Sequence, residues 1–593
     1  SAQYSRKWRV GIALLVGGVL IALCLLGFYL NAESRKAEYH AAAKSRADKD
    51  SSAADDHAHG GTGSTVEQQG DAGTGYSSTR WRTAGACKNI ERSCPPGYSS
   101  PLVLLIAIDG LRPDMISASA APALHHLTQC GASARHLTPV YPSSTAPNLY
   151  TLVTGLYPES HGIIGSEMYS TETGGTFKEG KYNSYNQPFW WEGEPVWNTI
   201  KSKGLRSAMY FWPGSDVQLA GGYPTYWYKY RDEYPLDTRV NMTLEWLLYE
   251  EEERPSLLGL YFDYPDKVAR EEGPFTLKAN RSLLEVDGQI DRLMATLEER
   301  QLTSCVDVMV VSGHGMAEAT CGGSLYLETF MEDIKKKARV VSGAVGRLQA
   351  KAGKASNKEI LQQLRCKNPK LRALSKDLLP VRYHYGNHKR IEDVILDTLP
   401  HNRVVTSESN YCVKAEHGFN NIETAMQGVF MASGPSFKSG YQGRGFSSVE
   451  LYNLLCTLLG VQPAHNNGTE GSLYGLLKQP PSTPNVSIDA WHENLLPFLH
   501  QQAREKAFLE VLVQTTKQPT TTTAATTPSA TLASASLTLA STAATPSAAV
   551  TTAAVTTAAT AATTATSSCC PCFCITYLGI YCCNYLCSCS KYY

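Results

Sequence analysis

Four acidic and imidazole side chains follow strand-like runs or turns of the sequence, at positions where they could share one site. Asp109, Asp266 and His314 each come within four residues of an apolar run, and His417 stands between a glutamate and a glycine. Carboxylates and imidazoles that project into one crevice are the donors that a metal site needs. Singly, each has an ordinary explanation, since a strand-end aspartate often caps the next helix and a lone histidine usually bonds a nearby carbonyl. Together they favour metal ligation.

Continuous apolar runs predict the elements that must hold these side chains in place. The predicted strands are 102–108, 207–211, 257–262, 306–311 and 428–431, and the predicted helices include 281–299 and 448–459. Apolar runs without alternation suit strands that helices cover on both faces. The pattern therefore predicts an α/β domain with a largely parallel central sheet flanked by helices. Ligands of such sheets gather just beyond the carboxyl ends of the strands.

The segment at residues 140–163 is the most specific motif in the chain. It reads VYPSSTAPNLYTLVTGLYPESHGI, and it closely resembles the nucleophile region of the ecto-nucleotide pyrophosphatase/phosphodiesterase family, within the alkaline-phosphatase-like superfamily. Further matches follow in order: CKNIERSCPPGYSSPLVLLIAIDGLRPD from Cys87, GEPVWNTI from Gly193, YFWPGSDV from Tyr210, RYHYGNHKRIEDVILDTLP from Arg382 and VELYNLLCTLLGVQPAHNNGTEGSLYGLL from Val449. The resemblance implies one phosphodiesterase/nucleotide pyrophosphatase-like domain over residues 87–500.

The resemblance also implies a reaction. In the family a threonine attacks phosphorus, and water then hydrolyses the covalent nucleotidyl-enzyme. Carried over by motif, Thr145 is the nucleophile and Asn148 donates a hydrogen bond to a phosphoryl oxygen. Tyr230 matches one of the two aromatic residues that hold the nucleobase.

Two zinc ions are part of what the resemblance implies. Asp109 and His314, together with Thr145, would hold one ion, and Asp266 and His417 would hold the other. A hydroxyl needs a metal to become a good nucleophile at neutral pH, and two cations can clamp the attacking and phosphoryl oxygens. The alternative is that neither residue has a catalytic role. His314 would then be present only because its loop packs well around it, and Thr145 would be an ordinary loop hydroxyl.

Four residues depart from the family pattern. Gly313 stands where the family has an aspartate zinc ligand, and Arg270 stands where it has a histidine ligand. Arginine cannot ligate zinc, because it stays protonated and offers no lone pair. Ala146 replaces the second aromatic residue around the base, and Leu149 replaces a histidine. Each zinc site has therefore lost one protein ligand, although Arg270 could instead stand in for a cation and bind phosphate bidentately.

Two functional hypotheses follow from the same fold. The first is a membrane-anchored ectoenzyme that hydrolyses nucleotide phosphodiester or pyrophosphate bonds with an impaired metal site. The alternative is a catalytically inactive pseudoenzyme that binds phosphorylated ligands or a protein partner. Gly313 and Arg270 are the features that discriminate between them. Fold alone does not decide, because function resides in the site.

The N-terminal sequence predicts a membrane anchor. Residues 10–30 form an uncharged apolar run long enough to cross a bilayer, and Arg6, Lys7 and Arg9 precede it. We expect a cytoplasmic tail at 1–9, a transmembrane anchor at 10–30 and a flexible Gly-, Ala- and Ser-rich stalk at 31–86. The expected topology is that of a single-pass type II protein with its catalytic domain outside the cell or in a lumen. A cleaved, unusually long signal peptide is the alternative, and it also exports the domain.

The C-terminal region has a biased composition. Residues 515–568 are rich in Thr, Ala and Ser and predict a mucin-like tail. Residues 569–593 form a cysteine-rich end, which suits acylation or metal binding, or carries no selected structure at all.

Sequons and cysteines agree with export. Asn241, Asn280, Asn467 and Asn485 each begin an N-x-Ser/Thr acceptor. The scattered cysteines between residues 87 and 412 form no C-x-x-C pair, so we expect disulfides, whose pairing the sequence does not fix.

Lys+Arg and Asp+Glu are both 54, and the chain has no nucleic-acid-binding motif. The expected ligand is a nucleotide or another small phosphodiester.

Overall fold

The structure is a computed structural model that describes residues 80–83, 87–407, 412–482, 575–577 and 580–582. The predicted segments 1–9, 10–30 and 515–568 lie outside the described residues, as do Asn485 and most of 31–86 and 569–593. Within the cysteine-rich end, β21 (Ile575–Tyr577) pairs antiparallel with β22 (Ile580–Cys582). Among the helices that the structure describes, none combines the length and apolar character that a bilayer crossing requires.

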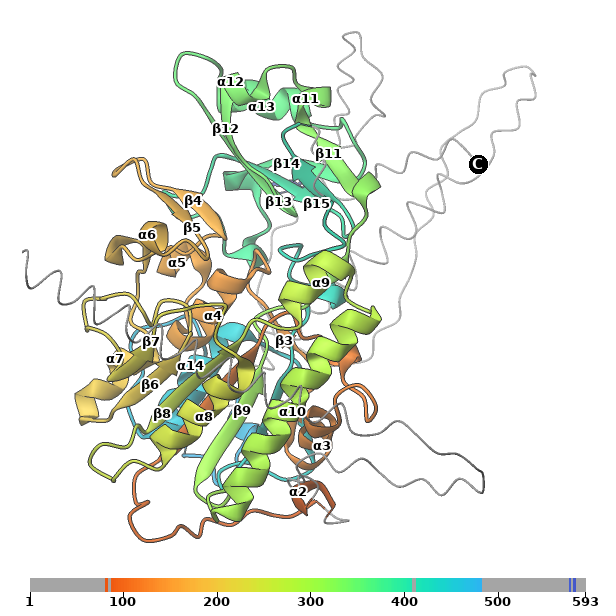
Figure 1. Cartoon of the computed structure of the whole chain (residues 1–593). Helices are drawn as coiled ribbons and strands as arrows, with labels where there is room; N and C mark the ends of the chain where they lie inside the picture. The colour runs from red at the N-terminus through yellow and green to blue at the C-terminus, as the bar shows by residue number, and fades with distance from the viewer. Residues whose placement is uncertain (1–79, 84–86, 408–411, 483–574, 578–579, 583–593) are drawn as a thin grey trace, which may run out of the picture. The chain divides into compact units, whose positions relative to one another are not determined.

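One mixed sheet organises the domain, and it confirms the predicted fold class (Figure 1). Its order is β19-β2-β18-β9-β1-β8-β6-β7, and the pairs from β9 to β7 are all parallel. The bounds are β1 (Leu102–Ile108), β2 (Ala132–Ala134), β6 (Ser207–Tyr210), β7 (Tyr226–Tyr228), β8 (Leu257–Phe262), β9 (Val306–Val311), β18 (Phe430–Ser433) and β19 (Tyr441–Gly443). Strand β18 runs antiparallel to both of its neighbours, β9 and β2.

The register of the central strands places their ends together. Ile108 pairs with Phe262, and Ala107 pairs with Val311. Every residue of β1, β8 and β9 is buried, because helices cover the sheet on both faces. The residues that follow these three strands therefore emerge side by side at one edge, as the sequence predicted.

Helices on both faces cover the sheet. In Figure 1, α8 (Leu236–Leu247) and α10 (Leu277–Glu299) lie in front of it, and α14 (Leu451–Leu459) lies behind it. Helix α10 begins four residues before the predicted 281, because the Thr276 side chain accepts a hydrogen bond from Ala279 N and caps an earlier turn. The predicted helix 448–459 begins as a 3₁₀ turn, Ser448–Glu450, before α14.

Two strands have bounds that differ from the predicted ones. The predicted strand 207–211 ends at Tyr210, because Phe211 adopts a φ of 67°, which breaks the extended chain. The predicted strand 428–431 begins two residues later, at Phe430. There Gly428 instead makes an isolated bridge to Leu137.

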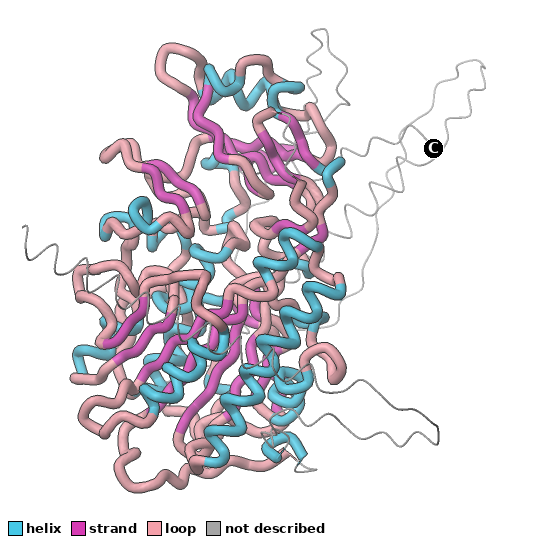
Figure 2. The backbone as a smooth tube through the Cα atoms, in the orientation of Figure 1, coloured by secondary structure: helices cyan, strands magenta, loops and turns pink. Residues whose placement is uncertain are grey.

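A second, antiparallel sheet was not predicted. Its order is β12-β13-β15-β14, and its strands are β12 (Ala338–Val341), β13 (Val345–Ala350), β14 (Leu371–Ser375) and β15 (Val394–Thr398). Figure 2 shows these strands as a group separate from the central sheet. With α13 (Asn357–Leu364) the sheet buries its own apolar cluster, which includes Leu348, Ile360 and Leu396. This insert forms one wall of the site described below.

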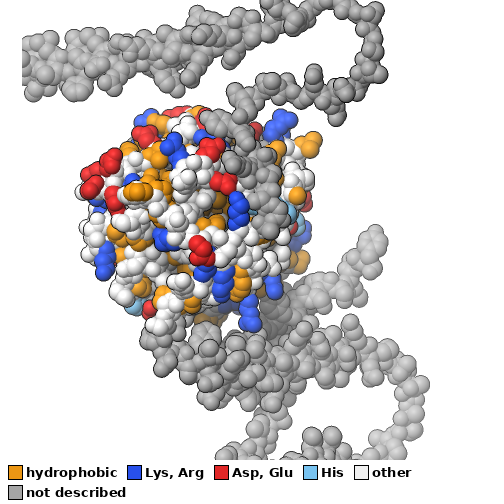
Figure 3. Space-filling view, turned by 90° about the horizontal axis from the view of Figure 1, so that it is seen from below, with side chains coloured by type: hydrophobic (Ala, Val, Ile, Leu, Met, Phe, Trp, Pro, Cys, Tyr) orange, Lys and Arg blue, Asp and Glu red, His pale blue; other side chains and the backbone are white. Residues whose placement is uncertain are grey.

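Three disulfides form among the described cysteines, as the export hypothesis expected. They join Cys87 to Cys130, Cys94 to Cys305 and Cys321 to Cys412. The face shown in Figure 3 carries acidic, basic and apolar side chains interspersed with one another, in line with the balanced charge of the chain. Among the sequons, Asn241, Asn280 and Asn467 are all exposed.

Candidate active site

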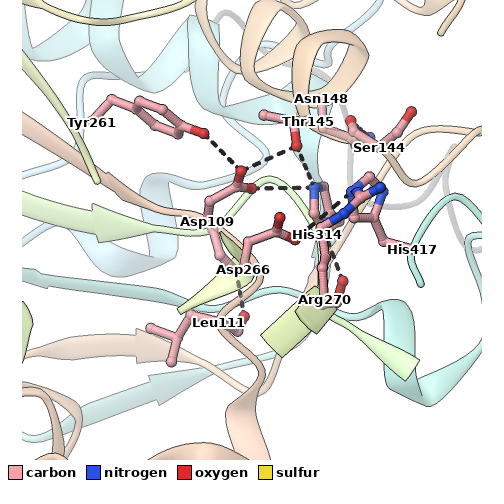
Figure 4. A network of polar contacts seen from close by, with 12 residues as sticks. Asp109, Leu111, Ser144, Thr145, Asn148, Tyr261, Asp266, Arg270, His314 and His417 are labelled. Atoms are coloured by element: carbon pink, nitrogen blue, oxygen red, sulfur yellow. Dashed lines mark hydrogen bonds and ion pairs between the residues drawn. The ribbon is translucent and has the colours of Figure 1, made fainter. Parts of the chain in front are cut away.

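Thr145 is the first residue of α4 (Thr145–Thr154), directly at the carboxyl edge of the sheet. Its Oγ1 donates a hydrogen bond to Oδ2 of Asp109 at 3.1 Å and lies 3.0 Å from Nε2 of His314. Figure 4 shows these three side chains pointing toward one another. Thr145 is only 7% exposed, and it lies at a helix N-terminus whose amide groups favour negative charge. Of the predicted residues, these three are therefore brought together.

Asn148 has contacts that differ from its expected role. Its Nδ2 donates to the carbonyls of Pro142 and Ser144 at 3.0 and 2.9 Å, and its Oδ1 accepts from Val140 N at 2.7 Å. The side chain is fully buried. In this arrangement the amide holds the loop that precedes Thr145. The direct contact of Asn148 with a phosphoryl oxygen stays a prediction, and we propose that the side chain also positions Thr145.

Asp109 is the centre of the polar network in Figure 4. It follows β1 directly, and its Oδ2 also accepts a hydrogen bond of 2.7 Å from the hydroxyl of Tyr261 in β8. Tyr261 was not predicted as a site residue. The one feature of the sequence that could have indicated its role is the tyrosine hydroxyl, which is a polar group in an otherwise apolar strand.

His314 is fixed by its own loop. Its Nδ1 lies 2.8 Å from the carbonyl oxygen of Gly315, so Nδ1–H donates there and Nε2 points at Thr145 and Asp109. Just before it, Ser312 Oγ donates to Leu111 O at 2.6 Å and accepts from Val429 N at 3.0 Å. Strand β9 is thereby held to both of its neighbours where the loop begins.

Asp266 and Arg270 come from α9 (Asp266–Glu272), four residues apart and so on one face of the helix. Oδ1 of Asp266 lies 3.7 Å from Nε2 of His417. Nη1 of Arg270 lies much closer to the same nitrogen, at 2.6 Å. The predicted ligands Asp266 and His417 are therefore neighbours, but a guanidinium faces the imidazole lone pair.

Charges within this buried cluster shift the proton affinities of its members. Burial raises the pKa of Asp109, but the charge of His314 and three side-chain hydrogen bonds outweigh it and hold that pKa below its usual value. Burial lowers the pKa of His314, yet the Asp109 carboxylate outweighs this and raises it. Burial and the charge of Asp109 raise the pKa of Asp266 to about 7. Burial, His314 and Arg270 hold the pKa of His417 well below its usual range.

One metal ion fits these residues, and two do not. Asp266, His314 and His417 each offer a ligand atom within 4.8 Å of the others, and Oδ1 of Asp109 lies 3.2 Å from Nε2 of His314. Because Arg270 faces Nε2 of His417, the donors left for one ion are Asp109, Asp266 and His314. Oδ1 of Asp109 and Oδ1 of Asp266 are buried and face imidazole nitrogens, at 3.2 Å from Nε2 of His314 and 3.7 Å from Nε2 of His417, and both oxygens can ligate a cation. A second ion would need the Nε2 lone pair of His417, which faces Arg270, and Gly313 supplies no carboxylate to either ion. The implied two-zinc arrangement therefore disagrees with this chain.

Two cavities adjoin the cluster and share Tyr230, Tyr261 and Glu179 in their linings. The smaller, about 220 Å³, is walled by aromatic rings, and both Ala146 and Tyr230 line it. The two residues therefore lie where they could contact one ligand, and the expected nucleobase site stays a prediction. The larger, about 630 Å³, contains Thr145 and Arg270 and extends to the insert at residues 341–345.

Further polar residues of the site were not predicted. The Tyr230 hydroxyl donates to Oδ2 of Asp263 at 2.9 Å, and the buried Arg239 holds Oδ1 of the same carboxylate at 2.7 Å. Glu179 is half-buried between the cavities, and burial raises its pKa. It follows a short hairpin strand, β5 (Thr176–Lys178), in a segment without any catalytic motif.

The sequence pattern of the type I phosphodiesterase / nucleotide pyrophosphatase family matches residues 103–420. The chain belongs to this family. The match begins in β1, just before Asp109, and ends just after His417, so it spans the whole polar cluster.

Family relatives extend the comparison. Ectonucleotide pyrophosphatase/phosphodiesterase family member 1 of Homo sapiens is 37% identical over 410 residues, which are 67% of this chain and 44% of that protein. Family member 3 of Mus musculus is 35% identical over 411 residues, 68% of this chain and 47% of that protein. Venom phosphodiesterase 2 of Crotalus adamanteus is 35% identical over 431 residues, with 71% and 53% covered. The chain thus matches about half the length of these family members.

Proposed function

We propose that this chain hydrolyses phosphodiester or pyrophosphate bonds of nucleotides, with Thr145 as the nucleophile and with an impaired metal site. The position of the Thr145 hydroxyl carries the proposal, since it lies 3.1 Å from Asp109 and 3.0 Å from His314 and lines the larger cavity. A hydroxyl held by a carboxylate and an imidazole at a helix N-terminus is placed to attack an electrophilic centre. Membership of the family supplies the class of bond.

In the proposed reaction, Oγ1 of Thr145 attacks phosphorus while the bond to the leaving oxygen breaks. The hydroxyl proton passes to Oδ2 of Asp109, which already accepts it as a hydrogen bond. The departing oxygen takes up a proton from the medium, and water later cleaves the phosphothreonine ester to restore the hydroxyl. The N-terminus of α4 supports the negative charge that develops on the phosphoryl oxygens.

A single zinc ion would be held by Asp109, Asp266 and His314. When bound, it would lower the pKa of the Thr145 hydroxyl and offset phosphate charge. Tyr261 keeps Asp109 aimed at this point through its 2.7 Å hydrogen bond. The buried, neutral His417 would remain beside Asp266, with Arg270 at its Nε2.

The second candidate is a pseudoenzyme that binds phosphorylated ligands without turnover. The contact of 2.6 Å between Arg270 and His417 favours the pseudoenzyme, because this contact removes a metal ligand from the site.

For either candidate we propose an exported, membrane-anchored protein, supported by the sequons, the three disulfides and the apolar run at 10–30.

Hydrolysis of a chromogenic nucleotide phosphodiester by the exported domain, supplied with zinc, tests the proposal. Thr145→Ala should lower the rate at least about 10³-fold, whereas Thr145→Ser, which keeps a hydroxyl, should retain part of it. Thr154→Ala is the matched control, because that threonine lies at the other end of α4, where its hydroxyl donates to Tyr150 O and accepts from Leu156 N. No turnover by the unmodified protein supports the pseudoenzyme, and full turnover by Thr145→Ala rejects Thr145 as the nucleophile.

A further inference from the structure

The contact between Arg270 and His417 is part of a larger, braced arrangement. Glu416 is buried, and its Oε1 lies 3.8 Å from Nη2 of Arg270 while its Oε2 lies 3.5 Å from Nε of Arg403. The backbone is tied as well, since Lys414 N donates to the carbonyl of Arg270 at 3.0 Å. The guanidinium is therefore held beside His417 from several sides.

The strand that carries Glu416 also contacts the chain just after His314. Glu416 belongs to β17 (Ala415–Glu416), which pairs antiparallel with β10 (Ala317–Glu318). Strand β10 begins three residues after His314, and the rings of His314 and His417 lie 4.2 Å apart between their centres. The place of the guanidinium relative to Asp109 and His314 is thus set by a short ladder and not by a long, mobile loop.

The donors that remain suffice for one cation. Asp109 and Asp266 each offer a buried carboxylate oxygen, and Nε2 of His314 lies 3.2 Å from that of Asp109. On the other side of Asp266, the imidazole lone pair of His417 faces a permanent positive charge, and a dication placed there would be repelled. Gly313 contributes no ligand atom.

We propose that Arg270 replaces the second cation of this site, so that one divalent ion and one guanidinium together bind a phosphate group. The inference deepens the proposed function and rests on its phosphate chemistry, but it does not require turnover. Arg270 lines the same cavity as Thr145, and its side chain is 36% exposed there. A planar guanidinium offers donors in the geometry of two phosphate oxygens, which a second zinc would otherwise contact.

Metal stoichiometry tests the first half of the inference. The exported domain is equilibrated with excess zinc, freed of unbound metal and analysed by elemental mass spectrometry. We expect one zinc per chain in the unmodified protein and almost none in His314→Ala. Arg270→His, which removes the charge and supplies an imidazole, should raise the content to two. Two zinc ions in the unmodified protein, no zinc in it, or no gain in a folded Arg270→His protein would each overturn the inference.

Binding of inorganic phosphate tests the second half. Calorimetry of the zinc-loaded protein should give an affinity that falls at least about 10-fold in Arg270→Gln and less in Arg270→Lys, which keeps the charge but loses the planar fork. Arg231→Gln is the matched control, since Arg231 is exposed and lies outside both cavities. Equal phosphate affinity in the unmodified protein and a folded Arg270→Gln protein would overturn this half. A protein that binds one zinc and phosphate but hydrolyses nothing keeps the inference and rejects the proposed hydrolysis.

Discussion

The side chain of Leu149 lies against Gly313. A Cβ built on Gly313 would be 3.2 Å from Cδ2 of Leu149 and 3.2 Å from Cβ of Asn148. Both positions depart from the family pattern, so the loss of a carboxylate at 313 and the presence of an apolar side chain at 149 are neighbouring changes in space. The carboxylate cannot be restored at 313 without a response from Leu149.

This contact predicts coupling between the two positions. Gly313→Asp alone should lower the free energy of unfolding by about 1–3 kcal/mol, because a buried side chain must be forced against Leu149. In a Leu149→Ala background the same change should cost less, since the truncated side chain leaves room. Urea unfolding of the four proteins of the double-mutant cycle measures the difference. If the two effects simply add, the two side chains do not compete for this space.

Nucleobase binding should depend on Ala146. Stacking on an aromatic ring contributes about 1–3 kcal/mol per base, and Ala146 supplies no ring opposite Tyr230. Ala146→Phe should therefore tighten binding of a nucleoside monophosphate about 5- to 150-fold while leaving inorganic phosphate unaffected. Calorimetry with both ligands makes the comparison. A similar change for both ligands would show that residue 146 does not contact the base.

His161 makes the fold sensitive to acid. Thr151 Oγ1 donates to Leu156 O at 2.8 Å, so Nε2–H of His161 donates to Thr151, and Nδ1 accepts from Ile163 N at 3.1 Å. The imidazole is fully buried and neutral, and burial lowers its pKa to about 3.

Proton binding at His161 sets the direction in which stability changes with pH. The unfolded chain binds a proton at His161 below its ordinary pKa and the folded chain does not, so stability is full above about pH 6.5 and falls as the pH decreases toward 3. Between pH 7.5 and 5.5 this amounts to about 1.4 kcal/mol. His161→Asn keeps the acceptor for Ile163 and should flatten that part of the stability profile, whereas His465→Asn, at an exposed position, should not. Parallel profiles for all three proteins would exclude His161 as the source.

The export hypothesis predicts glycans at three described sequons. Asn241, Asn280 and Asn467 are exposed, so each can carry an N-linked glycan while the domain stays folded. Peptide N-glycosidase should lower the apparent mass of protein made in secreting cells, and replacement of all three asparagines by glutamine should remove most of that shift. Unglycosylated protein that resists protease on intact cells would contradict the predicted topology.

Much of the fold followed from the sequence because the central strands are unbroken apolar runs. The strands that carry the site, β1, β8 and β9, were predicted with their observed bounds. The insert escaped prediction, because strands such as β14 (Leu371–Ser375) bury alternate residues only and lie among charged turns. Its pairing depends on contacts distant in the sequence, which local patterns do not record.

The acid and imidazole cluster was predictable for the same reason, since its members follow strand ends or family motifs. The contacts of Asn148 were not, because a motif position does not reveal which backbone groups an amide satisfies. Tyr261 and Glu179 were also missed. Tyr261 reads as an ordinary strand residue, and the place of Glu179 depends on how a hairpin packs beside the sheet.

The proposed reaction requires Thr145 to be the group that attacks phosphorus. Rapid acid quenching of the zinc-supplied protein during turnover of a nucleotide phosphodiester, followed by mass spectrometry of its peptides, tests this directly. We predict a nucleotidyl mass on the peptide that contains Thr145, and its loss in Thr145→Ala along with the activity. Sustained turnover without any adduct, or an adduct on another residue that persists in Thr145→Ala, would contradict the account.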